Sequence, residues 1–169
     1  AQCMDLVVAY DFLPRYKFRQ YGIDAITFYS SYDKRRYFKM DNVEKSIDVS
    51  FVGAIANKRH RKEYVDYIIE NGIGIEVFGS DSRQEQISLE KMVEIFNKTK
   101  INLNFTGMSI RNPLKKLPNI DLRIRQMKGK NAEVALCGSF VLSEYAIGTE
   151  EVFDINKEIV VFHNKEDMV

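Results

Sequence analysis

The stretch that decides the fold is Arg123–Tyr145, RIRQMKGKNAEVALCGSFVLSEY. Its first residues are basic, and the apolar run Lys130–Cys137 that follows Gly129 has helical character. Gly138 predicts the end of this helix, because glycine commonly follows the last helical residue. Ser139–Ser143 is a short β-rich run of the kind that is buried in a parallel sheet. The stretch therefore predicts a loop, a helix, a turn and a strand, in that order.

Charged side chains gather at the start of this predicted helix. Arg125, Lys128 and Lys130 lie at or just before it, where free backbone N–H groups already favour an anion. Glu133 falls in the first turn, where a carboxylate can accept hydrogen bonds from hydroxyl groups. Basic groups for phosphate and a carboxylate for a sugar diol together suit a nucleoside diphosphate. The residues leave a second interpretation open, a basic surface loop in which Glu133 is a favourable charge at a helix start.

From Asp48 onward, predicted strands alternate with predicted helices. The expected strands are Asp48–Val52, Ile73–Phe78, Lys100–Phe105, Ser139–Ser143 and Glu158–Phe162, and the expected helices are Arg59–Asn71, Ser88 to about Thr99, Lys130–Cys137 and Ile147–Phe153. Asn164 is expected to cap a final, truncated helix. The alternation predicts an α/β fold, a Rossmann-like parallel sheet with helices on both faces. In such sheets ligands bind at the carboxyl ends of the strands.

The residues before Asp48 predict a separate unit. Asp5–Tyr10 and Ala25–Tyr29 are expected strands, with a short helix at Leu13–Tyr21 between them. Ser31–Ile47 is polar and charged with interleaved aromatic side chains, which predicts a packed linker. We place the domain boundary near Asn42–Ser46. The first residues resemble the middle of a protein, so we expect a piece of a longer chain.

Composition and charge indicate an ordinary globular protein. Of its 169 residues, 45% are hydrophobic and 29% charged, and the net charge of +1 indicates neither nucleic acid nor membrane as a partner. The basic excess between Arg111 and Lys130 also permits an RNA patch, but no nucleic-acid motif accompanies it. Cys3 and Cys137 imply no disulfide framework, which fits a reducing cytosol. No apolar run approaches the roughly 18 residues that span a bilayer, so we expect a cytoplasmic protein without a membrane span.

Missing motifs argue against several kinds of site. The loop after the first main strand has one glycine, Gly53, so the G-x-G-x-x-G dinucleotide fingerprint is absent, and there is no G-x-x-x-x-G-K-[ST] P-loop. His60 and His163 lack cysteine or histidine partners at ligand spacing, so we expect neither a metal nor a cofactor. No G-x-S-x-G nucleophile elbow occurs. The basic run Asn57–Lys62 fits a phosphate site and a solvated helix face equally well.

An ordered set of short motifs resembles a known family. The motifs are DVSFVG (Asp48–Gly53), EVFG (Glu76–Gly79), KINLNF (Lys100–Phe105), KGKNAEVALCGSFVLSEY (Lys128–Tyr145), EEVF (Glu150–Phe153) and KEIVVF (Lys157–Phe162). In this order they resemble the CgeB-like glycosyltransferases, relatives of the retaining group-1 enzymes with the GT-B fold. The resemblance implies that residues 47–169 are the nucleotide-sugar-binding domain, truncated at its C-terminus. Residues 1–46 then resemble the end of the N-terminal domain and the interdomain linker.

The resemblance also implies which residues bind the donor. Glu133 matches the second glutamate of an E-x7-E pair and would contact the ribose, whereas Arg125 occupies the position of the first. Basic residues would hold the diphosphate, and Tyr145 with the turn to Thr149 would face the donor phosphates and sugar. The donor-binding residues that we expect are Gly53, Arg59, Arg61, Arg125, Lys128, Lys130, Glu133, Tyr145 and Thr149.

The activity implied by the resemblance is transfer of a sugar from a nucleoside-diphosphate sugar to an acceptor hydroxyl. The leaving diphosphate would be neutralised by Arg, Lys and a helix N-terminus rather than by a metal. The family usually has Arg and Phe where this chain has Lys130 and Ala132, and the lysine keeps the charge but loses the bidentate fork. The acceptor site would lie elsewhere in the full-length enzyme, so this chain alone should bind donor and turn over little.

The sequence suggests two alternatives to this activity. One is a non-catalytic nucleotide-binding or interaction module of the same fold. The other is a flavodoxin-like or receiver domain, in which a phosphoacceptor aspartate would follow the third main strand. Here Lys100–Phe105 is followed by Thr106, which argues against a receiver.

Overall fold

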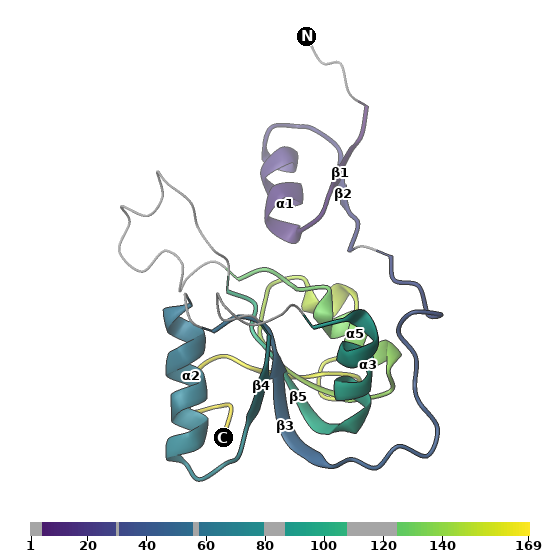
Figure 1. Cartoon of the computed structure of the whole chain (residues 1–169). Helices are drawn as coiled ribbons and strands as arrows, with labels where there is room; N and C mark the ends of the chain where they lie inside the picture. Colours follow the sequence, from purple (N-terminus) through teal and green to yellow (C-terminus); the bar gives the residue numbers. More distant parts are fainter. Residues whose placement is uncertain (1–4, 30, 56–57, 80–86, 108–124) are drawn as a thin grey trace.

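The computed structural model describes residues 5–29, 31–55, 58–79, 87–107 and 125–169 (Figure 1). In these residues the strands form two separate sheets, both parallel. The smaller sheet pairs β1 (Val7–Ala9) with β2 (Ala25–Thr27), and α1 (Phe12–Gln20) connects them. The larger sheet has the strand order β4-β3-β5-β6-β7. The predicted α/β class, with a Rossmann-like parallel sheet, is confirmed.

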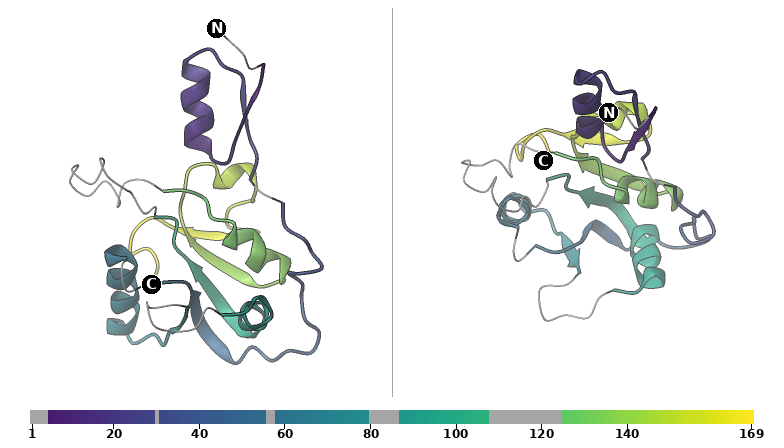
Figure 2. Two further views of the ribbon diagram at one scale, coloured as in Figure 1. Left: turned by 45° about the horizontal axis from the view of Figure 1, so that its top comes forward. Right: turned by 90° about the horizontal axis from the view of Figure 1, so that it is seen from above.

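Helices cover both faces of the larger sheet. Its elements in chain order are β3 (Ile47–Val52), α2 (Arg59–Glu70), β4 (Glu76–Phe78), α3 (Leu89–Lys98), β5 (Thr99–Asn104), α5 (Lys130–Leu136), β6 (Phe140–Glu144), the 3-10 helix η2 (Thr149–Glu151) and β7 (Val160–Phe162). Figure 2 shows α2 on one face and α3 with α5 on the other. From β3 the chain first adds β4 on one side and then crosses over to add β5 on the other. The strand order therefore changes direction between β3 and β5.

Alternating side chains of the strands form an apolar layer under each set of helices. On the α2 face, Phe51 of β3 packs edge-on against Phe105, with ring centroids 5.0 Å apart, and Phe105 also contacts Phe162. On the α3 and α5 face, Val52 and Val141 pack against residues of the two helices. Burial of these side chains supplies the main driving force for the fold.

A row of buried polar side chains runs through the α3 and α5 face. We call Ser50, Asn102, Asn104, Asn131 and Ser143 the polar row. Asn104 Nδ2 donates to Asn131 Oδ1 at 2.6 Å, and Asn131 Nδ2 donates to Ser143 Oγ at 3.2 Å. Ser50 Oγ lies 3.4 Å from Asn102 Oδ1. These bonds satisfy buried amides that would otherwise be costly, and they tie α5 to β5 and β6.

The linker packs on the larger sheet, as its aromatic residues predict. Asn97 of α3 accepts a hydrogen bond from Met40 N at 2.8 Å and donates to Phe38 O at 3.0 Å. Lys45 Nζ donates to Thr99 O and to Ser139 Oγ, both at 2.9 Å. The segment is therefore attached to the larger sheet by side-chain and backbone contacts.

Polar contacts also join the smaller sheet to the larger one. The Arg15 guanidinium of α1 forms an ion pair with Glu151 of η2, and the Tyr29 hydroxyl donates to the same carboxylate at 2.9 Å. Burial, followed by the hydrogen bond to Glu151, raises the pKa of Tyr29 to about 12. Among the described residues, none of the helices is both long and apolar enough to cross a membrane.

Several expected elements differ in the structure, and the strands β1, β2 and β7 are shorter than expected. The expected strand Ile73–Phe78 is shorter in the structure: β4 starts only at Glu76, two residues after Gly74, and ends at Phe78. The expected helix Ile147–Phe153 is reduced to η2, because Gly148 adopts a φ of +93° that interrupts a right-handed helix. The expected final helix was wrong. In residues 163–169, which are all described, Asn164 Oδ1 accepts from Asp167 N at 2.8 Å and closes a single turn.

Candidate functional site

A cavity of about 310 Å³ opens at the carboxyl edge of the larger sheet. Its polar lining includes Tyr32, Arg61, Asn104, Lys128, Lys130 and Glu133, and its other walls are Phe51, Val52, Gly53, Phe105 and Gly129. The walls thus come from the ends of β3 and β5, from α2 and from the start of α5. Ligands of open parallel sheets bind where the strand order changes direction. The cavity occupies that position, between the ends of β3 and β5.

Arg61 supplies a cation with an unused donor. Its Nη1 donates to Ala54 O at 3.0 Å, and its guanidinium lies 5.6 Å from the centroid of the Phe51 ring. Its buried Nε has no hydrogen-bond partner among the described residues. Burial lowers the pKa of Arg61, and the carboxylate of Glu144 opposes that effect. A guanidinium that lines a cavity is suited to an anionic oxygen.

Two lysines from the start of α5 complete the basic wall. Lys130 Nζ donates to Val52 O and lies 5.9 Å from the Phe51 ring centroid, so its position is determined by β3. Lys128 Nζ donates to the side chain of Gln126 at 3.1 Å. Burial lowers the pKa of both lysines, and repulsion by Arg61 lowers it further. An anion in the cavity would relieve this repulsion.

Glu133 is the carboxylate of the cavity wall. Burial raises its pKa, while attraction by Lys130 and a hydrogen bond from the Tyr37 hydroxyl lower it. The side chain is thus oriented by a tyrosine of the linker and lies within electrostatic range of Lys130. The predicted residues Gly53, Lys128, Lys130 and Glu133 are brought together with Arg61 around one cavity.

Residues 11–169 match the family described as "Glycosyl transferase-like". The chain belongs to this family. The match includes α1, β2 and the linker as well as the larger sheet, and it starts after β1. No match was found among curated proteins.

Two polar cavity residues of this glycosyl transferase-like chain were not predicted, Tyr32 and Asn104. Tyr32 comes from the linker, and a Cβ added at Gly129 would lie 1.5 Å from its hydroxyl oxygen. Position 129 must therefore lack a side chain if Tyr32 is to close the wall. Tyr37, which orients Glu133, contacts Tyr32 edge-on at 6.0 Å between ring centroids. The aromatic composition of the linker indicated packing but not where it would pack.

Arg125 was expected to bind donor but does not line the cavity. Its Nε lies 2.6 Å from Oε1 of Glu144, a carboxylate at the end of β6 with 1% exposure. The other oxygen of Glu144 accepts from the backbone N–H groups of Thr106 and Gly107 at 2.8 and 3.1 Å. The structure thus places Arg125 in an ion pair with a buried carboxylate outside the cavity lining.

Tyr145 and Thr149 also lie outside the cavity lining. The Tyr145 hydroxyl donates to Glu150, and its ring lies 4.8 Å from that of His163. Thr149 is 1% exposed and donates from Oγ1 to Ala146 O at 2.7 Å. The side chain of Arg59 lies outside the described part of the chain. A role of these residues in donor binding stays a prediction.

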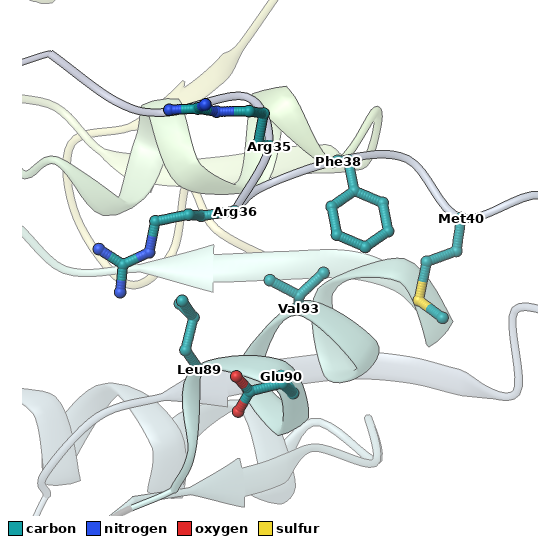
Figure 3. A pocket seen from close by; sticks show the side chains of 7 residues that line it. All are labelled: Arg35, Arg36, Phe38, Met40, Leu89, Glu90 and Val93. Carbon is teal, nitrogen blue, oxygen red and sulfur yellow. The ribbon is translucent and has the colours of Figure 1, made fainter.

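A second hollow of about 380 Å³ lies between the linker and the first turns of α3 (Figure 3). Figure 3 shows Phe38, Met40 and Val93 pointing toward one another across it. Arg35 at its rim is engaged by Asp33, with Nη2 2.9 Å from Oδ2. This hollow gathers none of the predicted donor-binding residues. Within the residues that the structure describes, no cluster of three or more His, Cys, Asp or Glu side chains could hold a metal ion.

Proposed function

We propose that this chain is the nucleotide-sugar-binding part of a CgeB-like glycosyltransferase, the C-terminal half of a GT-B fold. The full-length enzyme would transfer a sugar from a nucleoside-diphosphate sugar to an acceptor hydroxyl. The observation that carries the proposal is the cavity between the ends of β3 and β5. There the cations Arg61, Lys128 and Lys130 share a wall with the carboxylate Glu133.

The basic wall suits a diphosphate in both charge and size. The volume of the cavity, about 310 Å³, lies in the range of small-molecule sites, which starts at about 300 Å³. The Arg61 guanidinium and the two lysine ammonium groups can each donate to phosphate oxygens. The same groups would stabilise the charge that develops on the diphosphate as the sugar leaves, so no metal is required for that step.

Glu133 is assigned to the ribose. A carboxylate next to a phosphate site would repel the phosphates, but it can accept hydrogen bonds from two neighbouring hydroxyls. Burial raises the pKa of Glu133, whereas Lys130 and the Tyr37 hydroxyl lower it and so oppose the loss of the charged form, which accepts the hydrogen bonds. The pair of Glu133 and Tyr37 would therefore orient the nucleoside while the lysines hold the diphosphate.

One observation favours the alternative of a non-catalytic nucleotide-binding module. Arg125 stands where the resemblance puts the first acidic residue of a pair, and its side chain is engaged by Glu144. The chain therefore lacks a carboxylate at that position. Such a protein would bind a nucleoside diphosphate without transferring sugar.

The test is isothermal titration calorimetry with UDP, GDP, ADP, CDP and inorganic pyrophosphate, with and without a chelator. We expect at least one nucleoside diphosphate to bind equally well in both conditions. Lys130→Met should weaken binding, whereas Lys157→Met, at an exposed lysine paired with Asp154, should not. Absence of binding, or strict dependence on magnesium, would contradict the proposal. Binding without sugar transfer by the full-length protein would favour the alternative.

A further inference from the structure

We propose that Glu144 is a positioning residue for this site, a role that rests on the proposed function. It holds together the two short segments that flank positions 108–124, Thr106–Gly107 and Arg125–Gln126. By doing so it places Lys128 at the cavity. Glu144 itself does not line the cavity, so it would act through its neighbours.

The first observation is the number of donors that converge on this buried carboxylate. Oε2 accepts from the backbone N–H groups of Thr106 and Gly107 and from the Thr106 hydroxyl, the last at 3.1 Å. Oε1 lies 2.6 Å from Arg125 Nε. Burying an ion pair costs desolvation free energy that an apolar pair would avoid, so the pair is weak evidence for stability. The three hydrogen bonds to Oε2 do fix geometry, because each of these donors defines a direction, whereas Arg125 contributes the charge of an ion pair.

The second observation is that the two segments run side by side. Gly107 and Arg125 form an antiparallel bridge, and Gln126 N donates to Thr106 O at 3.0 Å. Glu144 binds both segments at once, Thr106 and Gly107 through one oxygen and Arg125 through the other. Their mutual position is therefore held both by the backbone bridge and by this carboxylate.

The third observation connects the segments to the cavity. Gln126 accepts from Lys128 Nζ at 3.1 Å, and Lys128 lines the cavity. On the other side, Thr106 directly follows the lining residue Phe105. Displacing the two segments would move a phosphate-binding cation and the end of β5 together. The negative charge of Glu144 also favours the charged forms of Arg61 and Lys128.

The experiment compares Glu144→Gln, Glu144→Asp and Arg125→Gln with wild type. Glu151→Gln is the matched control, since this carboxylate also pairs with an arginine but at the α1–η2 contact. Three quantities are measured on the whole folded chain. They are amide hydrogen exchange at Thr106, Gly107 and Gln126, the rate at which Lys128 is acetylated, and the Kd for inorganic pyrophosphate.

We expect Glu144→Gln and Arg125→Gln to exchange these amides faster and to label Lys128 faster. Their Kd should rise at least about tenfold, the equivalent of about 1.4 kcal/mol. Glu144→Asp keeps the charge and should rescue part of the affinity, and Glu151→Gln should behave like wild type. Because Arg125 is partly exposed, its variant provides the answer if Glu144→Gln does not fold.

Two results would overturn the inference. One is an unchanged Kd in variants whose amides exchange faster, which would make the contact purely structural. The other is unchanged exchange and unchanged Lys128 labelling. If wild type binds neither pyrophosphate nor a nucleoside diphosphate, the proposed function fails instead, and the exchange and labelling data still decide whether Glu144 positions Lys128.

Discussion

Replacing Glu133 with glutamine should weaken nucleotide binding while leaving the fold intact or more stable. The substitution keeps the size of the side chain but removes the charge with which it would accept hydrogen bonds from the ribose. A lost charge-assisted hydrogen bond corresponds to roughly 1.5–3 kcal/mol, or about tenfold to a hundredfold in Kd. Inorganic pyrophosphate has no ribose, so its affinity should stay the same or rise slightly as a neighbouring negative charge is removed.

The expected change in stability follows from the pKa of Glu133. Burial raises this pKa above 4.5 even though Lys130 and Tyr37 lower it, so on balance the folded protein favours the neutral carboxyl. Proton binding by Glu133 therefore adds to the free energy of unfolding. This contribution is fully present below the unfolded pKa and is lost as pH rises through the higher folded pKa. Glutamine resembles the neutral form. At pH 7 the variant should therefore unfold at equal or higher urea concentration than wild type, and the difference should vanish in acid.

Calorimetry and urea denaturation test both parts of this prediction. The ligands are the best nucleoside diphosphate, its 2′,3′-dideoxy analogue and pyrophosphate, and Glu70→Gln, at an exposed carboxylate of α2, is the control. If Glu133 were only a favourable charge at a helix start, Glu133→Gln would give the opposite pattern. The variant would lose about 0.3–1 kcal/mol in stability, and its affinity for the nucleoside diphosphate would be unchanged. That pattern, or an equal loss of affinity for the dideoxy analogue, would refute the role of Glu133.

Three further predictions concern the same walls. Lys130→Met should weaken pyrophosphate binding yet raise the urea midpoint at pH 7, because burial lowers the pKa of Lys130 and its charge opposes folding. A lysine whose folded pKa is depressed lowers the stability of the protein as pH falls through that folded pKa. The advantage of Lys130→Met in urea midpoint over wild type should therefore shrink toward pH 10, where the wild-type lysine loses its proton. Gly129→Ala should destabilise the fold by displacing Tyr32, and Tyr32→Ala should suppress the defect; equal stability of Gly129→Ala and wild type would argue against the contact. A chain that starts at Lys45 should be about 2 kcal/mol less stable than one that starts at Ser31, because Asn97 loses two hydrogen bonds to the linker at about 1 kcal/mol each. Identical urea midpoints of the two chains would contradict this last expectation.

The elements of the larger sheet were predictable because their patterns are local. The run Lys100–Phe105 alternates apolar and polar residues, and the strand found is Thr99–Asn104. Ser88 caps α3 as expected, with its Oγ accepting from Lys91 N at 3.2 Å. The expected helix after Asn164 is not found in residues 163–169, where a side-chain bond closes a single turn.

The candidate site was predictable where its residues are sequence neighbours or follow strand ends. Lys128, Lys130 and Glu133 lie within one loop and helix start, and Arg61 follows β3 closely. The partners that orient them were not predictable. The path of the linker decides that Tyr37 reaches Glu133, and no local pattern shows that Arg125 pairs with a carboxylate across the sheet.

The polar row constrains the register in which β5 pairs with its neighbouring strands. A shift of β5 by one residue would turn Asn102 and Asn104 toward the α2 face, into the apolar layer around Phe51 and Phe105. Each amide left unpaired there would cost about 1–3 kcal/mol, so misaligned pairings are disfavoured even though both faces can bury apolar side chains. Because Asn104 also lines the cavity, the bonds that select the alignment of β5 also determine the shape of the site. A substitution at Asn104 would therefore disturb the register of β5 and the wall of the cavity together.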